Sequence, residues 1–545
     1  MTAVFDQVRA SLPLTSSLPA LSRLDSRVLT FTHPRNQQLF VIGCVNEIGG
    51  PCSRCFERKL ELLWRRTGAD RPSLDAEEAR DAVRAAAEGG IPLAMTNAGI
   101  GQNWSIITPW PDCRTCREAR VDTPGVSHAH EQQRAGGTTS EAGVSSVSGV
   151  PRSSTPADFV QEHRDWFGFA SVLLNPSMNG EHGVFTADTG MFLDAREPLA
   201  PVGGKGISAD QALASCLGEG IERFAIAGGL DSAADEFTRI DGSLFADSPW
   251  RGARDFDGRL LEPGPGQSVE MAELQPLCGT ARQSFPASLV YAPYTPPQGC
   301  SALTPSSTTG AAVGKTVAEA TVQAVLELIE RDSFWYYSRH GGVLPTVDLN
   351  EDPLVALLIA GEDVHVSARL LENPFDVPVV HVALARRSKE GGTRTARGMG
   401  ASMTLRSATQ KALVEATQML RSLDTGVDID PSITDMRSLW FDGTAVDVFP
   451  QFFPGAPASR APSVRLDNAE TASAVLDLLV QRGTRAGVRF YRHVFAKTSS
   501  FAAVRCIADR ILPLDDEYFP ALNRFGDWGI DTNREQWSYR GPLFM

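Results

Sequence analysis

Carboxylate, amide and hydroxyl side chains recur at the same spacing in three separate stretches of this chain. Within each stretch they follow one another at steps of three, four, four and three, so in a helix they lie on one face. The first set is Ser208, Gln211, Ser215, Glu219 and Glu222, the second is Thr316, Glu319, Gln323, Glu327 and Glu330, and the third is Thr404, Ser407, Lys411, Glu415 and Gln418. For any single helix, the alternative is an ordinary solvent-exposed polar face, which would more often mix lysine with glutamate. Three matching, oxygen-rich faces instead suit Mg²⁺ and nucleotide phosphates, so we expect an acidic metal cluster.

Three helices must carry these faces, and the first is the best defined. Apolar residues at Leu213, Leu217 and Ile221 line its other side, which is typical of an amphipathic helix packed on a core. A glycine loop at 203–206 precedes it. There Lys205 is expected to reach a phosphate, because loop amides and a helix N-terminus add positive potential. The alternative is an exposed lysine in a turn.

The entry to the second helix is nearly a phosphate-binding P-loop. Gly310, Gly314, Lys315 and Thr316 fit that motif with one residue missing, which would misplace the amides that wrap a phosphate. We therefore interpret 306–316 only as a small-residue entry to the helix, after a strand predicted over 284–294. The third helix is predicted from about residue 405, after a buried strand at 377–384. His381 in that strand is expected to be a core or pocket-wall residue rather than a base.

Three motifs in this order resemble a known family. Gly-Lys-Gly-x-Ser at 204–208, followed by Ser-x-x-x-Glu-x-x-Glu-Arg at 215–223, resembles the signature of the YcaO family of ATP-dependent peptide-backbone-modifying enzymes. The stretch 324–332 is similar to its second motif, and Gly-Met-Gly at 398–400 with 411–418 is similar to its third. The likeness covers roughly residues 157 to 510. It implies an α+β or α/β architecture, namely the YcaO fold of mixed sheets and packed helices, with a small N-terminal zinc-binding α/β subdomain.

The resemblance also implies roles for individual residues. The expected catalytic magnesium ligands are Glu219, Glu222, Glu327, Glu330 and Glu415. The expected nucleotide-binding residues are Lys205, Ser208, Ser215, Gln323, Arg331, Gln418 and Arg505. Arg505 lies in the second of two paired closing strands, expected over 488–495 and 502–507. The last residues, 540–545, lack the alternating-proline tail common in azoline-forming members.

Four cysteines near the N-terminus are spaced as two Cys-x-x-Cys pairs. Cys52, Cys55, Cys113 and Cys116 suit a tetrahedral structural zinc, with a redox dithiol or unrelated free thiols as the alternatives. Their surroundings resemble the carboxy-terminal part of E1-like (ThiF-like) partner proteins of cyclodehydratases. We expect a zinc-binding docking domain over 1–119, a flexible linker over 120–156 and the catalytic domain over 157–545. The His-x-His pair at 128 and 130, within the linker, is assigned no function.

Composition narrows the remaining classes. The 545 residues carry a formal net charge of −14 and no basic block, so nucleic acid is not expected as a partner. Neither a signal pattern nor a membrane-length apolar run is visible, so we expect no membrane association and a cytoplasmic protein.

The expected activity is that of an ATP-dependent cyclodehydratase that uses ATP, Mg²⁺ and a structural Zn²⁺. It would convert Cys, Ser or Thr of a ribosomally synthesised precursor peptide to thiazoline or oxazoline, as in thiopeptide-type natural-product biosynthesis. The resemblance implies a separate E1-like, leader-peptide-binding partner, a dehydrogenase in the same pathway and a homodimer. The alternatives are a thioamide- or amidine-forming enzyme of the same family and a catalytically silent ATP-binding scaffold.

Overall fold

The computed structural model describes most of the chain after residue 149. It covers residues 150–511 apart from 168–171, 182, 192–199, 231–236, 246–247, 256–257, 350–351, 360–363, 388–392, 425–439, 441–442 and 457–469, together with four earlier backbone strands. Those strands form one antiparallel sheet in the order β1 (Asp25–Thr32), β2 (Gln38–Val45), β3 (Met95–Asn97) and β4 (Ser105–Ile106). The four predicted zinc ligands lie outside the described residues. Within the described part, no helix is long and apolar enough to span a bilayer.

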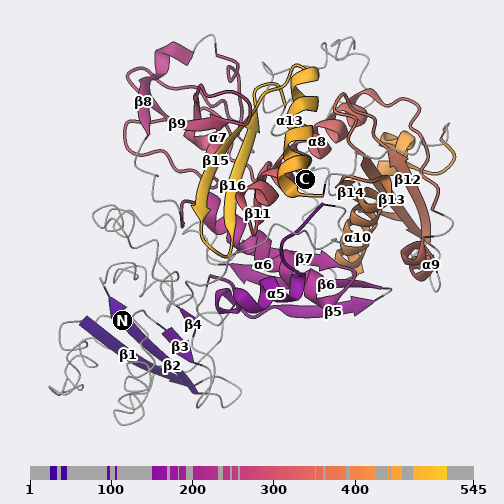
Figure 1. Cartoon of the computed structure of the whole chain (residues 1–545), viewed down its shortest axis with the longest axis horizontal. Coiled ribbons are helices and arrows are strands. Elements are labelled where there is room, and N and C mark those ends of the chain that lie inside the picture. The colour runs from indigo at the N-terminus through magenta and orange to yellow at the C-terminus, as the bar shows by residue number, and fades with distance from the viewer. Residues whose placement is uncertain are drawn as a thin grey trace.

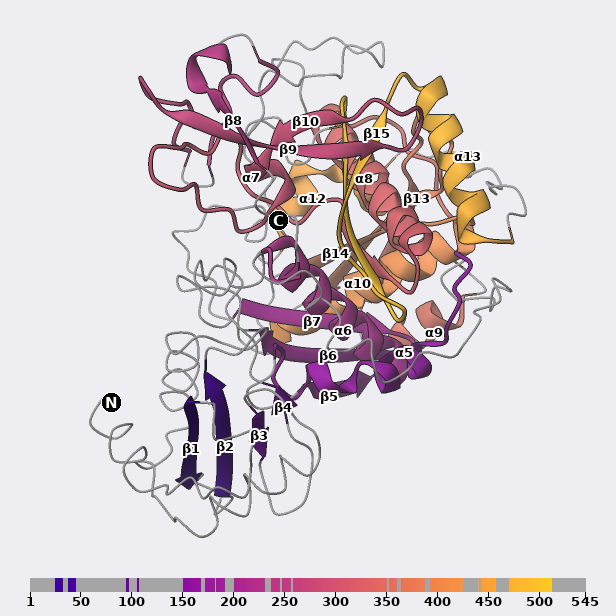
Figure 2. The same cartoon turned by 60° about the vertical axis from the view of Figure 1, so that its left-hand side comes forward.

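Three antiparallel sheets form the rest of the structure and confirm the expected mixed α/β architecture (Figures 1 and 2). The first contains β5 (Ser177–Glu181), β6 (Val184–Met191) and β7 (Ala200–Gly206). The second contains β12 (Val364–Leu370), β13 (Val379–Arg387) and β14 (Thr393–Ala401). The third has six strands, β8 (Thr238–Asp241), β9 (Ser268–Pro276), β10 (Gln283–Pro286), β11 (Ala311–Gly314), β15 (Phe490–Lys497) and β16 (Ala502–Ala508).

Three long helices follow the last strand of a sheet or a strand at a sheet edge. They are α6 (Ala209–Ile226) after β7, α8 (Val317–His340) after β11, and α10 (Leu405–Asp424) after β14. Each helix packs on its own preceding strand and also contacts the strand of another unit: α6 meets β11, α8 meets β14, and α10 meets β7. The three strand–helix units therefore close into a ring, and Figure 1 shows the three helices gathered in the middle of the molecule.

The shorter elements surround this ring. They are α5 (Pro156–Glu162), α7 (Ala287–Val290), α9 (Pro353–Ile359), α12 (Ala445–Val448) and α13 (Ala472–Arg485), with 3₁₀ turns η3 (Arg164–Trp166), η4 (Gly242–Phe245) and η5 (Pro450–Phe452). The main core encloses α8, whose Ile329 and Phe334 are fully buried. His381 is also fully buried, with its ring centroid 4.1 Å from that of Phe452, which confirms it as a core residue.

A hydroxyl residue begins each of the three helices. Ser208 and Thr316 are the N-caps of α6 and α8, and their side chains accept hydrogen bonds from the backbone amides of Gln211 and Glu319. Thr404 accepts in the same way from the amide of Ser407. Capping satisfies amides that have no partner inside the helix, so the first residue of each polar set fixes where its helix starts.

The expected glycine loop before α6 is wrong, because residues 203–206 are the end of strand β7. Lys205 pairs with Thr186 of β6 in the sheet register. The glycines are needed for packing: a Cβ on Gly204 would lie 2.0 Å from the carbonyl oxygen of Ala212 and 2.2 Å from the amide nitrogen of Cys216. The strand and the helix thus touch backbone to backbone, which only glycine permits. Gly398 of β14 is in the same position against α10.

Two other predicted segments differ in detail. The strand expected over 284–294 ends at Pro286, where the short helix α7 begins, although β10 is present. The last residues of the expected linker are packed against the domain: Val150 is buried, and Ser153 donates from its amide and its hydroxyl to Glu319, at 3.0 and 2.5 Å. The paired closing strands β15 and β16 are confirmed as an antiparallel pair.

Candidate active site

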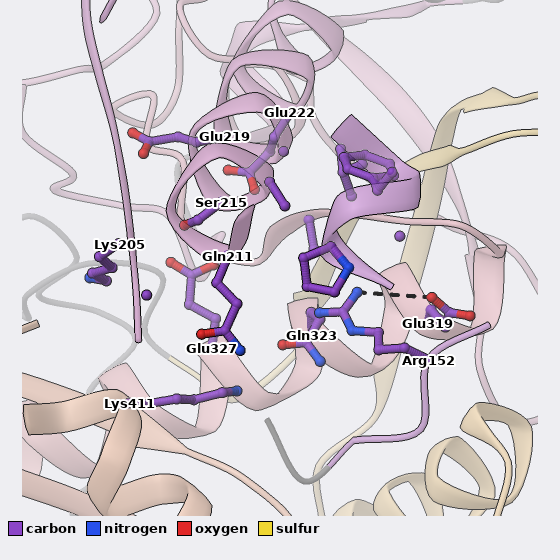
Figure 3. Close-up of a pocket in the computed structure, with 18 of the residues that line it drawn as sticks. Arg152, Lys205, Gln211, Ser215, Glu219, Glu222, Glu319, Gln323, Glu327 and Lys411 are labelled. Atoms are coloured by element: carbon purple, nitrogen blue, oxygen red, sulfur yellow. Dashed lines mark ion pairs between the residues drawn. The ribbon is translucent and has the colours of Figure 1, made fainter. Parts of the chain in front are cut away.

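The three polar helix faces line one cavity of about 760 Å³. Counting from each capping hydroxyl, the residues three, seven and eleven positions later all face it in every helix. In this way α6, α8 and α10 each contribute one residue to three successive layers. Figure 3 shows Gln211 of α6 close to Glu327 and Gln323 of α8, with Lys411 of α10 reaching toward them from the opposite side.

The layer farthest from the capping hydroxyls is acidic. Glu219, Glu327 and Glu415 stand eleven residues after their caps, and Glu222 and Glu330 lie three residues further on. Backbone amides of the strand segments hold some of these carboxylates in place. Gly310 donates to Glu327 at 3.2 Å, Met399 donates to Glu415 at 3.3 Å, and Ala401 donates to Glu330 at 2.7 Å. The strands therefore set the direction of the carboxylates as well as that of the helices.

Basic side chains neutralise part of this layer. Arg223 pairs with Glu219 at 2.6 Å and Arg331 with Glu327 at 3.0 Å, each one helical turn apart. Lys205 on β7 pairs with Glu415 on α10 at 3.3 Å and so connects two of the three units. These pairs are partly exposed, and their value lies mainly in holding the carboxylates in place.

Burial and mutual repulsion separate the carboxylates into two kinds. Burial and the neighbouring Glu327 and Glu219 raise the pKa of Glu222 well above its usual range. Burial and Glu415 raise the pKa of Glu330 to about 7. Burial also acts on Glu415, but Lys205 and Arg397 outweigh it and lower the pKa of that group. These carboxylates are so close together that some of them keep a proton. A divalent cation bound between them would displace the protons and reduce the repulsion between the carboxylates.

The raised pKa of Glu330 predicts a dependence of stability on pH. Its pKa rises from 4.5 to about 7 on folding, so between those values the folded protein holds a proton that the unfolded chain releases. The ligand-free protein is therefore expected to lose stability as the pH rises from about 4.5 to about 7. Thermal unfolding of wild type and Glu330→Gln across this range measures it. The variant should lack this part of the decline, and parallel curves would contradict the assignment.

The two layers nearer the capping hydroxyls contain amides, hydroxyls, one carboxylate and one lysine. Gln211, Glu319 and Ser407 form one layer, and Ser215, Gln323 and Lys411 the next. Arg152 also lines the cavity and pairs with Glu319 at 3.9 Å, as the dashed line in Figure 3 marks. The amide nitrogen of Gln323 is buried and has no hydrogen-bond partner among the described residues. A buried donor of this kind in a cavity wall can be satisfied by a bound ligand.

The comparison with known families agrees with this geometry. The sequence profile described as YcaO cyclodehydratase, ATP- and Mg²⁺-binding, matches residues 203–510, which include all three helices. The chain belongs to the YcaO family.

Relatives of this YcaO protein are distant. A curated relative from Methanothermobacter thermautotrophicus, described as an uncharacterized protein, is 27% identical over 243 residues, which cover 43% of this chain and 54% of the relative. The chain thus spans about half the length of that relative.

Solved structures share the fold. A heterocyclase in complex with substrate and cofactor has a TM-score of 0.69 at 16% identity, covering 98% of this chain and 80% of its own. The heterocyclase TruD has a TM-score of 0.57 at 15% identity, over 96% and 76%. YcaO from Methanopyrus kandleri, bound with AMPPCP and Mg²⁺, has a TM-score of 0.52 at 18% identity, over 67% and 93%. At such identities the likeness establishes the fold of this YcaO chain.

Nine of the twelve residues predicted for the YcaO site line the cavity. They are Glu219, Glu222, Glu327, Glu330, Glu415, Lys205, Ser215, Gln323 and Arg331. Three do not. Ser208 caps α6, and the amide of Gln418 lies beside Gly203. Arg505 is fully buried and donates to the carbonyl oxygen of Ser307 at 2.5 Å. Their assignment as direct nucleotide contacts is not supported by these positions.

Sequence reasoning also missed cavity residues. Glu319, Gln211 and Lys411 were visible as members of the polar sets, but nothing singled them out. Arg152 had no signal, because it lies in a Ser-, Thr- and Gly-rich stretch that is typical of a linker. Only the packed position of that stretch places Arg152 in the wall.

The donor set fits the magnesium that the family implies. Mg²⁺ prefers carboxylate oxygens and retains several waters, so it does not need a complete protein cage. Among the residues that the structure describes, no three His, Cys, Asp or Glu side chains are close enough to enclose a metal ion. Glu219, Glu327 and Glu415 are instead paired with arginine or lysine. Crowded acids with raised pKa values, next to the unsatisfied amide of Gln323, nevertheless match a metal-bound anion.

Proposed function

We propose that this YcaO protein is an ATP-dependent cyclodehydratase that converts Cys, Ser or Thr of a ribosomally made peptide to azolines. The observation that carries the proposal is the cavity into which three separate helices present six carboxylates, five of them in one acidic cluster, with basic side chains beside them. Such a cavity suits a nucleoside triphosphate with Mg²⁺. Phosphates and carboxylates repel one another, so they come close only where metal ions and basic side chains lie between them.

The proposed roles follow the layers. The five acidic residues would hold Mg²⁺, which supplies charge neutralisation for the phosphates. Lys205 and Arg331 would offset charge on the transferring group, while Ser215 and Gln323 would orient phosphate or metal oxygens. Arg505 is proposed to act from behind the wall, because its positive charge lowers the pKa of Glu222 against the effect of burial. Ser208 is proposed to act by fixing the start of α6.

The proposed reaction needs no protein nucleophile. A peptide thiol or hydroxyl attacks the preceding amide carbonyl, and its proton leaves to solvent or a base. The resulting oxyanion takes the terminal phosphoryl group of ATP, and ADP leaves. Loss of the amide proton and expulsion of phosphate then form the ring double bond. ATP is required because an amide oxygen is a poor leaving group, and positioning with charge neutralisation supplies most of the acceleration.

Partners belong to the same proposal. We expect a separate leader-peptide-binding protein, docked on the N-terminal unit at 1–119, which the predicted linker at 120–156 joins to the catalytic domain. The zinc site, the linker boundaries, the homodimer and a pathway dehydrogenase stay predictions. Metal analysis of the purified protein by mass spectrometry, compared between wild type and Cys52→Ser/Cys113→Ser, tests the zinc site.

The decisive test is reconstitution. The purified protein is incubated with ATP, Mg²⁺, a precursor peptide encoded nearby and its leader-binding partner, and the peptide is weighed by mass spectrometry. Loss of one water per modified residue supports cyclodehydration. Exchange of oxygen for sulfur, when sulfide is supplied, indicates a thioamide-forming enzyme instead. An unchanged peptide with the full set of components, together with ATP binding, would contradict catalysis and favour a scaffold.

A further inference from the structure

Lys411 breaks the pattern that the three helices otherwise share. It stands seven residues after its cap, where α6 has the neutral Ser215 and α8 has the neutral Gln323. All three side chains line the cavity, in the layer next to the acidic one. Figure 3 shows Lys411 extended from α10 toward Gln323 and Gln211. One unit of the ring therefore adds a positive charge at a position where the other two have none.

Lys411 also differs from the other basic residues of the cavity wall in its pairing. Five of them form an ion pair with a carboxylate: Arg152, Lys205, Arg223, Lys315 and Arg331. Lys411 forms none with the described residues, and its ammonium donates only to the carbonyl oxygen of Ala401, at 3.1 Å. An ammonium has three hydrogens to donate, so two remain for a ligand.

The surroundings make this charge costly without a ligand. Burial lowers the pKa of Lys411 to about 8, and the positive charges of Arg152 and Lys205 push it the same way, whereas Glu330 opposes them. These charged groups come from the 150–155 segment (Arg152), β7 (Lys205) and α8 (Glu330). An anion placed against Lys411 would reduce this penalty, because it adds a counter-charge to that of Glu330, which forms no ion pair with the ammonium.

We propose that Lys411 binds a phosphate oxygen of the nucleotide, one helical turn away from the acidic layer. The inference rests on the proposed ATP-dependent function. Residues one helical turn apart, such as Lys411 and Glu415, have Cβ atoms about 5–6 Å apart. Neighbouring phosphates of one nucleotide can therefore reach both the metal-binding carboxylates and the Lys411 ammonium. Lysine is a usual point-charge partner for phosphate. The alternative role, as a proton acceptor, would require Lys411 to be neutral and would leave nucleotide affinity unchanged.

The test measures ATP binding by calorimetry in the presence of Mg²⁺, using the full chain. Lys411→Met is expected to weaken ATP binding at least tenfold, while Lys411→Arg, which keeps the charge, should stay within about threefold of wild type. Lys497→Met is the matched control, because Lys497 is exposed on β15 and lies outside the cavity lining, so its loss should leave ATP binding unchanged. Thermal unfolding of the ligand-free variants checks that each is folded.

A second readout uses pH. ATP affinity of the wild type should fall at alkaline pH, where the Lys411 ammonium loses its proton, because burial lowers the pKa of this group. Lys411→Arg should not show this fall. Equal ATP binding by wild type and Lys411→Met would overturn the inference while leaving the proposed function intact. Weaker binding that arginine does not restore would also overturn it. If wild type itself binds no ATP with Mg²⁺, the proposed function fails first.

Discussion

Replacing Glu327 with glutamine is expected to lower the turnover number for peptide modification roughly 10²–10³-fold, the usual effect of removing one electrostatic stabiliser from an active site. The carboxylate of Glu327 is held by the amide of Gly310 and the guanidinium of Arg331, so it faces the cavity in a fixed direction. Glutamine has the same shape and can still accept the Gly310 hydrogen bond, although its NH₂ group cannot accept from Arg331. The variant therefore removes charge with little change in structure.

The measurement is the rate of peptide modification at saturating ATP, followed by mass spectrometry. Glu273→Gln is the matched control, because Glu273 lies on β9, half exposed and outside the cavity, in a pair with Arg282. It should keep wild-type activity. A Glu327→Gln enzyme that retains more than about a tenth of the wild-type rate would show that this carboxylate carries no metal-bound charge.

Replacing Gly204 with alanine is expected to destabilise the folded protein by about 3 kcal/mol or more, at the upper end for overpacking. The added methyl would lie 2.0 Å from the Ala212 carbonyl oxygen and 2.2 Å from the Cys216 amide nitrogen. Both are backbone atoms, so α6 must move away from β7. Glu219 would move with the helix, and loss of ATP binding should accompany the loss of stability.

Gly218→Ala is the matched control on the same helix. A Cβ there meets nothing within 4 Å. Alanine is better than glycine inside a helix by about 0.5–1 kcal/mol, so this variant should be slightly more stable than wild type. Denaturant unfolding of both variants gives the comparison. A Gly204→Ala protein with wild-type stability would mean that α6 does not pack on β7 as closely as described.

The helices of this site were predictable because their polar faces repeat. Steps of three and four mark one face of a helix, and hydroxyl residues mark where the helices begin, so α6, α8 and α10 were located from the sequence. The acidic layer followed from the same pattern. The strand at 203–206 could not be predicted in this way. Glycines and a lysine are typical of turns, and only the close packing of α6 on this strand explains the glycines. Arg152 was missed because its position depends on a long-range contact with Glu319, which no local pattern reveals.

The ring of strand–helix units has a consequence for how the protein is assembled from pieces. Each strand–helix unit forms one wall of the cavity. The three walls are held together by the contacts of α6 with β11, of α8 with β14 and of α10 with β7. A fragment that ends before β11, or one that begins after α8, therefore lacks part of the cavity wall, even if the fragment itself folds. We expect two fragments, made by cleaving the chain between α8 and β12, to bind ATP only when they are mixed. ATP should in turn strengthen the association of the two fragments.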